Sequence, residues 1–179
     1  MENKIDTRIP VTILTGFLGS GKTTLLNYLI AAFPEKKFAI IENEFGEINI
    51  DSALIVSQDK NVYELSNGCI CCVLNEDLVN VLYELIESKK EFNHLLIETT
   101  GIADPSSIAL NFITDIGVQQ KFRLDGIVAL ADSINLLKQL DETDEAEKQL
   151  AVADLIILNK KTDAGLELEK ETIQAITAI

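Results

Sequence analysis

The sequence lacks, or nearly lacks, several residue types on which common protein classes depend. It has no tryptophan, one histidine, three cysteines and only two arginines, Arg8 and Arg123, among 179 residues. An odd number of cysteines makes no complete disulfide framework, so we expect reduced thiols. The single histidine, His94, has no neighbouring ligand and would make a poor metal site, so we interpret it as an incidental boundary residue.

Long apolar runs and positive charge are also missing. An apolar run such as Ile127–Ala131 is far shorter than a membrane span, and residues 1–4 do not open a signal peptide. The net charge of -14 opposes the phosphates of nucleic acids and the anionic surface of membranes. We therefore expect a cytoplasmic protein that binds neither nucleic acid nor membranes.

With 47% apolar residues, the chain can bury a core, and residues 1–179 are expected to form one domain. Short β-branched runs alternate with amphipathic stretches, which predicts an α/β fold with a mostly parallel sheet flanked by helices. The predicted strands are Val11–Thr15, Phe38–Glu42, Val62–Leu65, Leu95–Glu98, Ile127–Ala131 and Leu155–Leu158. The predicted helices span residues 22–33, 75–90, 106–114, 133–152, with a break near 141, and 165–178.

Residues 16–23 read Gly-Phe-Leu-Gly-Ser-Gly-Lys-Thr and match the phosphate-binding pattern GxxxxGK(S/T) in full. The motif follows a predicted strand and opens a predicted helix, which is the context it requires. Glycines allow backbone N–H groups to surround a phosphate, Lys22 reaches the outer phosphates and the Thr23 hydroxyl coordinates Mg²⁺. The sequence therefore predicts a three-layer P-loop nucleoside triphosphatase fold.

A second pattern, Leu95–Gly101, is an apolar strand that ends in an acid, Glu98, with a glycine three residues later. In P-loop proteins, the acid at this strand end lies beside Mg²⁺, and a nearby glycine N–H senses the γ-phosphate. Glu98 either holds a metal-bound water or orients the attacking water, and the sequence does not decide between these roles. We expect Lys22, Glu98 and Gly101 to carry the catalytic chemistry.

The base-reading pattern of GTPases, NKxD, is shifted in residues 159–163, which read NKKTD. If the pattern begins at Asn159, its fourth position is a threonine and not an aspartate. If Asp163 is the acid, the first position is Lys160 and not an asparagine. We favour the second alternative, with Asp163 on the base and Lys161 stacked over it. An aspartate there accepts two hydrogen bonds that only guanine donates, so guanine is expected in preference to adenine.

All three cysteines, Cys69, Cys71 and Cys72, lie within four positions after a glycine. Soft thiolates at this spacing suit tetrahedral Zn²⁺ or a neighbouring metal such as Co²⁺. A fourth ligand would come from water, from a partner or from the acids of residues 42–47, which leave the second strand at the phosphate-loop edge. Inert buried cysteines and a redox pair are the alternatives, and clustering in a glycine-bounded loop favours the metal.

Four stretches together carry a family resemblance: GFLGSGKTTLLN, IENEFGEINID, ELSNGCICC and LLIETTGIADP. In this order they resemble the CobW-like metallochaperone family of P-loop GTPases, related to the GTPases that assist urease and hydrogenase maturation. The resemblance extends from about Pro10 to Asp163. Family members usually continue into a smaller C-terminal domain, so we expect residues 1–179 to be a GTPase domain without it.

The resemblance implies that GTP, GDP and Mg²⁺ bind, that GTP is hydrolysed slowly, and that Zn²⁺ or Co²⁺ passes to a client metalloprotein. It also allows a nucleotide- or metal-dependent dimer. The implied metal ligands are Cys69, Cys71 and Cys72, with Glu42 and Glu47 as accessory ligands. The implied nucleotide residues are Gly19, Ser20, Gly21, Lys22, Thr23 and Thr24, with Glu98 and Asp51 on the Mg²⁺ side and Asp163 on the base. Two other functions stay open: a metal-storage or redox-sensor module with a structural nucleotide, and a P-loop small-molecule kinase.

Overall fold

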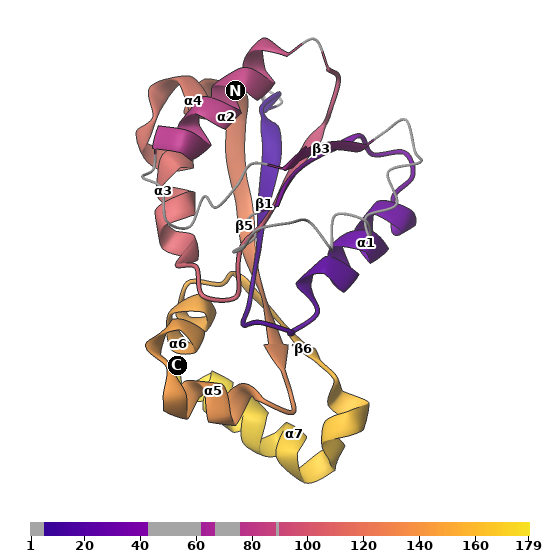
Figure 1. The fold of residues 1–179 in the computed structure, drawn as a ribbon, viewed down its shortest axis with the longest axis vertical. Helices are drawn as coiled ribbons and strands as arrows, with labels where there is room; N and C mark the ends of the chain where they lie inside the picture. Colours follow the sequence, from indigo (N-terminus) through magenta and orange to yellow (C-terminus); the bar gives the residue numbers. More distant parts are fainter. Residues whose placement is uncertain (1–5, 43–61, 67–75, 89) are drawn as a thin grey trace, which may run out of the picture.

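The structure, a computed structural model that describes residues 6–42, 62–66, 76–88 and 90–179, contains a six-stranded sheet (Figure 1). The strand order is β3-β2-β4-β1-β5-β6, and every pair is parallel, which agrees with the mostly parallel sheet that the sequence predicted. The strands are β1 (Ile9–Thr15), β2 (Phe38–Glu42), β3 (Val62–Ser66), β4 (His94–Glu98), β5 (Phe122–Asp132) and β6 (Leu155–Asn159).

The helices agree with the predicted stretches in most places. They are α1 (Lys22–Ala32), α2 (Glu76–Glu87), α3 (Pro105–Thr114), α4 (Ile116–Lys121), α5 (Leu136–Glu142), α6 (Asp144–Ala151) and α7 (Lys161–Ala178). The predicted helix 133–152 is two helices, because Thr143 adopts an extended conformation with φ -145° and ψ 142°. Helix α4 was not predicted, and α7 begins four residues before the predicted start at 165, with a kink at Gly165.

The two faces of the sheet are covered unequally. Alternate residues of the central strands, such as Ile13 and Ile97, pack with α2, α3 and α4 in the largest buried cluster. Residues one position away, such as Leu14 and Leu96, pack against Leu26 of α1 on the other face. This alternation follows from the two-residue period of a strand, and it produces the expected helix–sheet–helix layering. No helix in the described part of the chain is long and apolar enough to span a membrane.

His94, at the start of β4, has a structural environment. Its Nε2 lies 2.9 Å from the Thr12 hydroxyl, and its ring meets the edge of Phe38 with the centroids 5.8 Å apart. Burial lowers the pKa of His94, and the charge of Lys36 lowers it further. These contacts account for the residue within the sheet and do not involve the phosphate loop.

Candidate nucleotide and metal site

The phosphate loop connects β1 to α1 at the carboxyl edge of the sheet. Gly16 has φ +135° and packs against the backbone of Leu130, where a Cβ atom would overlap the Leu130 carbonyl oxygen. Gly21, with φ +103°, precedes α1, and no side chain caps this helix N-terminus. The first N–H groups of a helix have no partner within the helix, so they are available to an anion such as phosphate. The loop therefore fits the phosphate cradle that the sequence predicted.

Lys22 lies inside this loop and is only 7% exposed. Its Nζ donates to the carbonyl oxygen of Gly16 at 2.9 Å and to that of Phe17 at 3.3 Å. Burial lowers the pKa of Lys22, while the charge of Glu98 acts in the opposite direction. The buried ammonium is held by neutral carbonyl oxygens, which an anionic phosphate would outcompete as its partner.

Thr23 and Glu98 meet across the end of the sheet. The Thr23 hydroxyl donates to Glu98 Oε1 at 2.8 Å, although the two residues lie 75 positions apart in the sequence. The next residue, Thr99, donates from its backbone N–H to Leu14 O at 2.9 Å and from its hydroxyl to Thr15 Oγ1 at 3.1 Å. Side-chain and backbone hydrogen bonds thus hold the end of β4 against the phosphate-loop motif and the end of β1.

Two buried hydroxyls near this junction have no protein partner. Ser20 is 0% exposed and Thr100 is 8% exposed. Neither hydroxyl oxygen has a hydrogen-bond partner in the described structure. A buried hydroxyl without a partner costs free energy, and a bound polar ligand relieves that cost. Gly101 lies directly against the backbone of Leu18, where a Cβ would overlap the Leu18 N atom. The expected sensor glycine is therefore adjacent to the phosphate loop.

The base side of the site is formed where β6 ends. Asn159 Nδ2 donates to the Ser20 carbonyl oxygen at 2.9 Å, which ties the end of β6 to the phosphate loop. Lys160 adopts a left-handed conformation with φ 58°, and its Nζ donates to Gly19 O and to Asp132 Oδ2, each at 2.9 Å. Burial raises the pKa of Asp132, but bonds from Asn135, Lys160 and the Ile134 N–H outweigh burial and lower the net pKa.

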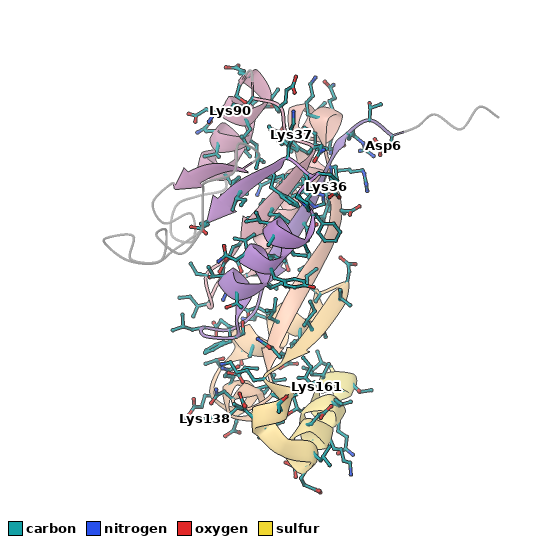
Figure 2. All side chains as sticks on the ribbon, turned by 90° about the vertical axis from the view of Figure 1, so that its right-hand side faces the viewer. Asp6, Lys36, Lys37, Lys90, Lys138 and Lys161 are labelled. Carbon is teal, nitrogen blue, oxygen red and sulfur yellow. The ribbon has the colours of Figure 1, made fainter. Side chains whose placement is uncertain are left out.

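Lys161 and Asp163 are the two residues that we expected to contact the base. Lys161 Nζ pairs with Glu169 of α7 at 2.6 Å, and Figure 2 shows Lys161 at the α7 end of the molecule. Asp163 is exposed, and its backbone N–H donates to Lys160 O at 3.2 Å. Of the two adjacent lysines, the structure therefore brings Lys160, and not Lys161, to the phosphate loop. Thr24, another expected nucleotide residue, is exposed in the first turn of α1.

Glu42 is placed beside Glu98 by the strand register. The two residues are Cα partners across β2 and β4, and Glu42 is also paired with Ser66 at the end of β3. The remaining predicted metal-side residues, Glu47, Asp51, Cys69, Cys71 and Cys72, lie outside the described residues. Within the described ranges, no group of three or more His, Cys, Asp or Glu side chains is arranged to hold a metal ion.

Two residues of this site were not identified from the sequence. Asp132 ends an apolar strand just as Glu98 does, so the same strand-end pattern would have marked it. Lys160 was considered only as the first position of a shifted pattern, and its contact with Asp132 depends on the pairing of β5 with β6. That pairing sets Asp132 opposite Asn159.

Comparison with known proteins agrees with this geometry. The sequence profile of the CobW/HypB/UreG nucleotide-binding domain matches residues 10–178. The zinc chaperone YjiA of Escherichia coli K12 is 41% identical over an alignment of 166 residues that covers 90% of this chain and 52% of the relative. The zinc-regulated GTPase metalloprotein activator 1 of Saccharomyces cerevisiae is 39% identical over 176 residues, covering 86% of this chain and 41% of the relative.

A solved structure is also similar. The crystal structure of Zn(II)-bound YjiA GTPase from E. coli aligns with a TM-score of 0.68 and 35% sequence identity, covering 93% of this chain and 54% of that one. The chain thus spans about half the length of the curated relatives it matches.

Proposed function

The chain belongs to the CobW/HypB/UreG nucleotide-binding family, and on that premise we propose that it is a GTP-hydrolysing metallochaperone. In this proposal it binds Zn²⁺, or Co²⁺, at Cys69, Cys71 and Cys72 and couples its nucleotide state to transfer of the metal to a client protein. Two of the similar proteins are a zinc chaperone and a zinc-regulated GTPase activator, which supports zinc as the cargo.

One observation supports nucleotide binding most directly. The Thr23 hydroxyl donates to Glu98 at 2.8 Å, next to the buried Lys22. This bond joins the hydroxyl and the carboxylate that would lie on the metal side of a bound triphosphate. Mg²⁺ would be held there by Thr23, with Glu98 behind it, and would neutralise charge on the phosphates. Lys22 would exchange its loop carbonyls for phosphate oxygens, and the Gly101 N–H would approach the γ-phosphate.

On the base side, we assign Lys160 to the wall of the guanine pocket, because it is the lysine that contacts the loop. Asp163 remains the proposed base reader, and Asn159 links the base side to the phosphate side through Ser20 O. Guanine selectivity then depends on Asp163, because adenine cannot donate the matching pair of hydrogen bonds.

The strand register supports coupling between metal and nucleotide. Glu42 is aligned with Glu98 on one side and with Ser66 on the other, and three positions separate Ser66 from Cys69 in the sequence. The chain therefore enters the cysteine segment at the same sheet edge as the nucleotide machinery. Glu42, Glu47 and Asp51 belong to the segment that would respond to nucleotide, with Glu42 and Glu47 as accessory ligands.

Slow hydrolysis is expected without a partner. Arg8 is bonded to Asp6 at 2.7 Å, and Arg123 is paired with Asp125, so both arginines are engaged at the other end of the sheet. A transition-state arginine accelerates phosphoryl transfer by about three to five orders of magnitude in GTPases that have one. The client protein, or a second copy in a nucleotide-dependent dimer, would supply the missing charge.

The test measures Zn²⁺ affinity by competition with a chromophoric chelator in Mg²⁺-GTP and in Mg²⁺-GDP. The control variant replaces Cys69, Cys71 and Cys72 with alanine. We expect an affinity that differs between the two nucleotides in the native chain and is lost in the variant. Equal affinities in both nucleotides would favour the storage or redox module, and phosphate transfer to a small acceptor would favour the kinase.

A further inference from the structure

Gln149 of α6 is a buried polar residue that the phosphate chemistry does not use. Its side chain is 1% exposed, yet it comes from the connection between β5 and β6, far in sequence from the residues around Glu98. Its Nε2 donates to Gly101 O at 3.0 Å and to Ala103 O at 3.1 Å. Of the two ends of the amide, only the nitrogen can donate to carbonyl oxygens, so these contacts also fix the orientation of the amide.

The two carbonyls belong to one tight turn. The backbone N–H of Ala103 donates to Thr100 O at 3.2 Å and closes the turn over Gly101 and Ile102. On one side, Gly101 packs against the backbone of Leu18 in the phosphate loop. On the other side, the turn is bonded to Gln149. The turn is therefore held between the phosphate loop and α6.

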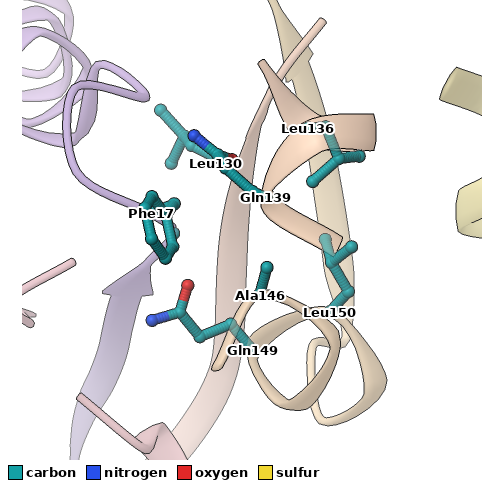
Figure 3. A pocket seen from close by; sticks show the side chains of 8 residues that line it. Phe17, Leu130, Leu136, Gln139, Ala146, Gln149 and Leu150 are labelled. Carbon is teal, nitrogen blue, oxygen red and sulfur yellow. The ribbon is translucent and has the colours of Figure 1, made fainter. Parts of the chain in front are cut away.

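The surroundings of Gln149 include a second glutamine. A cavity of about 10 Å³ behind the phosphate loop is lined by Phe17, Gln139 of α5 and Gln149, among other residues. Figure 3 shows Phe17 facing the Gln149 amide across this cavity. Gln139 is 8% exposed, and the Oε1 atoms of both glutamines have no hydrogen-bond partner in the described structure. Gln139 thus shares the burial and the cavity, while the hydrogen bonds to the turn come from Gln149.

We propose that Gln149 is a positioning residue, which holds the turn Thr100–Ala103 so that Gly101 faces the γ-phosphate position. Through this turn, Gln149 couples GTP binding to α6. The inference rests on the proposed GTP-binding function. Because Thr100 O is bonded to the Ala103 N–H, the peptide plane that carries the Gly101 N–H is fixed. Gln149 fixes the next plane through Gly101 O. The Gly101 N–H is then already oriented, so the binding of GTP costs no further conformational entropy in the turn.

This role predicts an effect on GTP that GDP does not share, because GDP has no γ-phosphate for Gly101 to contact. Two hydrogen bonds from Gln149 fix the turn. We expect Gln149→Met to weaken binding of a non-hydrolysable GTP analogue about tenfold, which corresponds to ~1.4 kcal/mol. Affinity for GDP should stay within twofold, and the single-turnover rate of GTP hydrolysis should fall with the analogue affinity.

The control is Gln139→Met, which removes a buried amide from the same cavity without touching the turn. Both variants are expected to lower the melting temperature to a similar extent, so stability alone does not separate them. The ratio of GTP-analogue to GDP affinity does, and only Gln149→Met should reduce it. Fluorescent analogues of the two nucleotides, titrated in Mg²⁺, measure this ratio directly.

Two outcomes overturn the inference, and they are distinguishable. If Gln149→Met weakens both nucleotides equally, or if Gln139→Met changes the ratio as much, Gln149 only supports the fold. If the native chain binds neither nucleotide, the proposed function fails and the positioning role fails with it. If Gln149→Met does not fold, Gln149→Asn replaces it, because this variant keeps a polar amide but is one methylene too short to reach both carbonyls and should also reduce the ratio.

Discussion

The phosphate side and the base side of the candidate site are built in different ways. On the phosphate side, Lys22 is bonded to Gly16 O and Thr23 to Glu98, through bonds that are buried or partly buried. Gly16 also packs against the backbone of Leu130. On the base side, Lys160 is one third exposed and is followed by exposed residues, Thr162 and Asp163 among them. The phosphate side is thus formed in advance, while the base side has one fixed lysine and an exposed acid.

The difference has a physical cause. A phosphate is recognised by backbone N–H groups and one ammonium, which a loop at the end of a strand supplies from a short stretch of sequence. A base is recognised by side chains at particular positions, so one added residue between Lys160 and Asp163 changes the recognition. We therefore expect substitutions on the phosphate side to affect all nucleotides strongly, and those on the base side to act more weakly.

The largest effect is expected for Lys22→Ala. This change removes the buried ammonium from the loop, and we expect affinity for GTP and GDP to fall at least 100-fold, or ~3 kcal/mol. Stability should change little, because burial already lowers the pKa of Lys22 and opposes its charged form in the free protein. Isothermal titration calorimetry and thermal unfolding measure the two quantities. Lys138→Ala, at an exposed lysine of α5, is the control, and unchanged nucleotide affinity in Lys22→Ala would contradict the assignment.

The next largest effect is expected for Glu98→Gln. The amide keeps the shape and can still accept a bond from Thr23, but it loses the charge that faces Mg²⁺. We expect the GTP hydrolysis rate to fall about 100-fold, while GTP affinity changes by less than about threefold. Recovery of the rate at high Mg²⁺ would identify Glu98 as the residue that holds a metal-bound water. Failure to recover would identify it as the residue that orients the attacking water.

Glu42→Gln is the matched control, because Glu42 is aligned with Glu98 on the adjacent strand. In the proposed function Glu42 is on the metal side, so this variant should weaken Zn²⁺ binding and leave GTP hydrolysis within twofold. If Glu42→Gln impaired hydrolysis as strongly as Glu98→Gln, the two acids would share one role.

On the base side, the adjacent lysines form a natural pair of variants. Lys160→Ala removes the bonds to Gly19 O and Asp132 and should weaken GTP and GDP equally, by about tenfold. Lys161→Ala removes only a half-exposed pair with Glu169 on α7, so affinity should stay within twofold. Fluorescent nucleotide titration measures both. A larger loss in Lys161→Ala would instead support Lys161 as the lysine at the base, as the sequence analysis favoured.

The contrast between the two lysines also shows which features can be predicted from the sequence and which cannot. The phosphate loop and its six flanking strands were predictable, because they depend on local patterns of glycine and of apolar residues. Strand β5 was predicted too short, since Arg123 and Asp125 interrupt the apolar run although the chain stays extended from Phe122. Helix α4 was missed because six residues are too few to show a helical period.

The contact of Lys160 with the phosphate loop was not accessible from local patterns. It depends on Asp132, which lies 28 positions before Lys160 and meets it only because β5 pairs with β6. Gln149 was overlooked for the same reason, because its partners Gly101 and Ala103 lie 48 and 46 positions away. The cysteine segment lies outside the described residues, so its role as a metal site stays a prediction.

The smallest expected effect concerns the charge of Asp132. The pKa of Asp132 is lowered in the folded protein from its ordinary value of 3.8, since the bonds from Asn135, Lys160 and the Ile134 N–H outweigh the opposing effect of burial. A carboxylate with a lowered pKa stabilises the folded state above pH 3.8, and this contribution is lost as the pH falls through the lower, folded-state value. The contribution is therefore complete at neutral pH.

Comparing the native chain with Asp132→Asn isolates this contribution from that of the other acids. At pH 7, the variant should unfold with about 1 kcal/mol less free energy, because its neutral amide makes a weaker bond to Lys160. The difference should shrink as the pH falls below 3.8, and urea unfolding of both proteins at pH 7 and at acidic pH measures it. A difference that stayed constant down to acid would mean that the carboxylate acts through its shape alone. The backbone conformation at Lys160, and not the charge of Asp132, would then determine the position of this lysine on the base side.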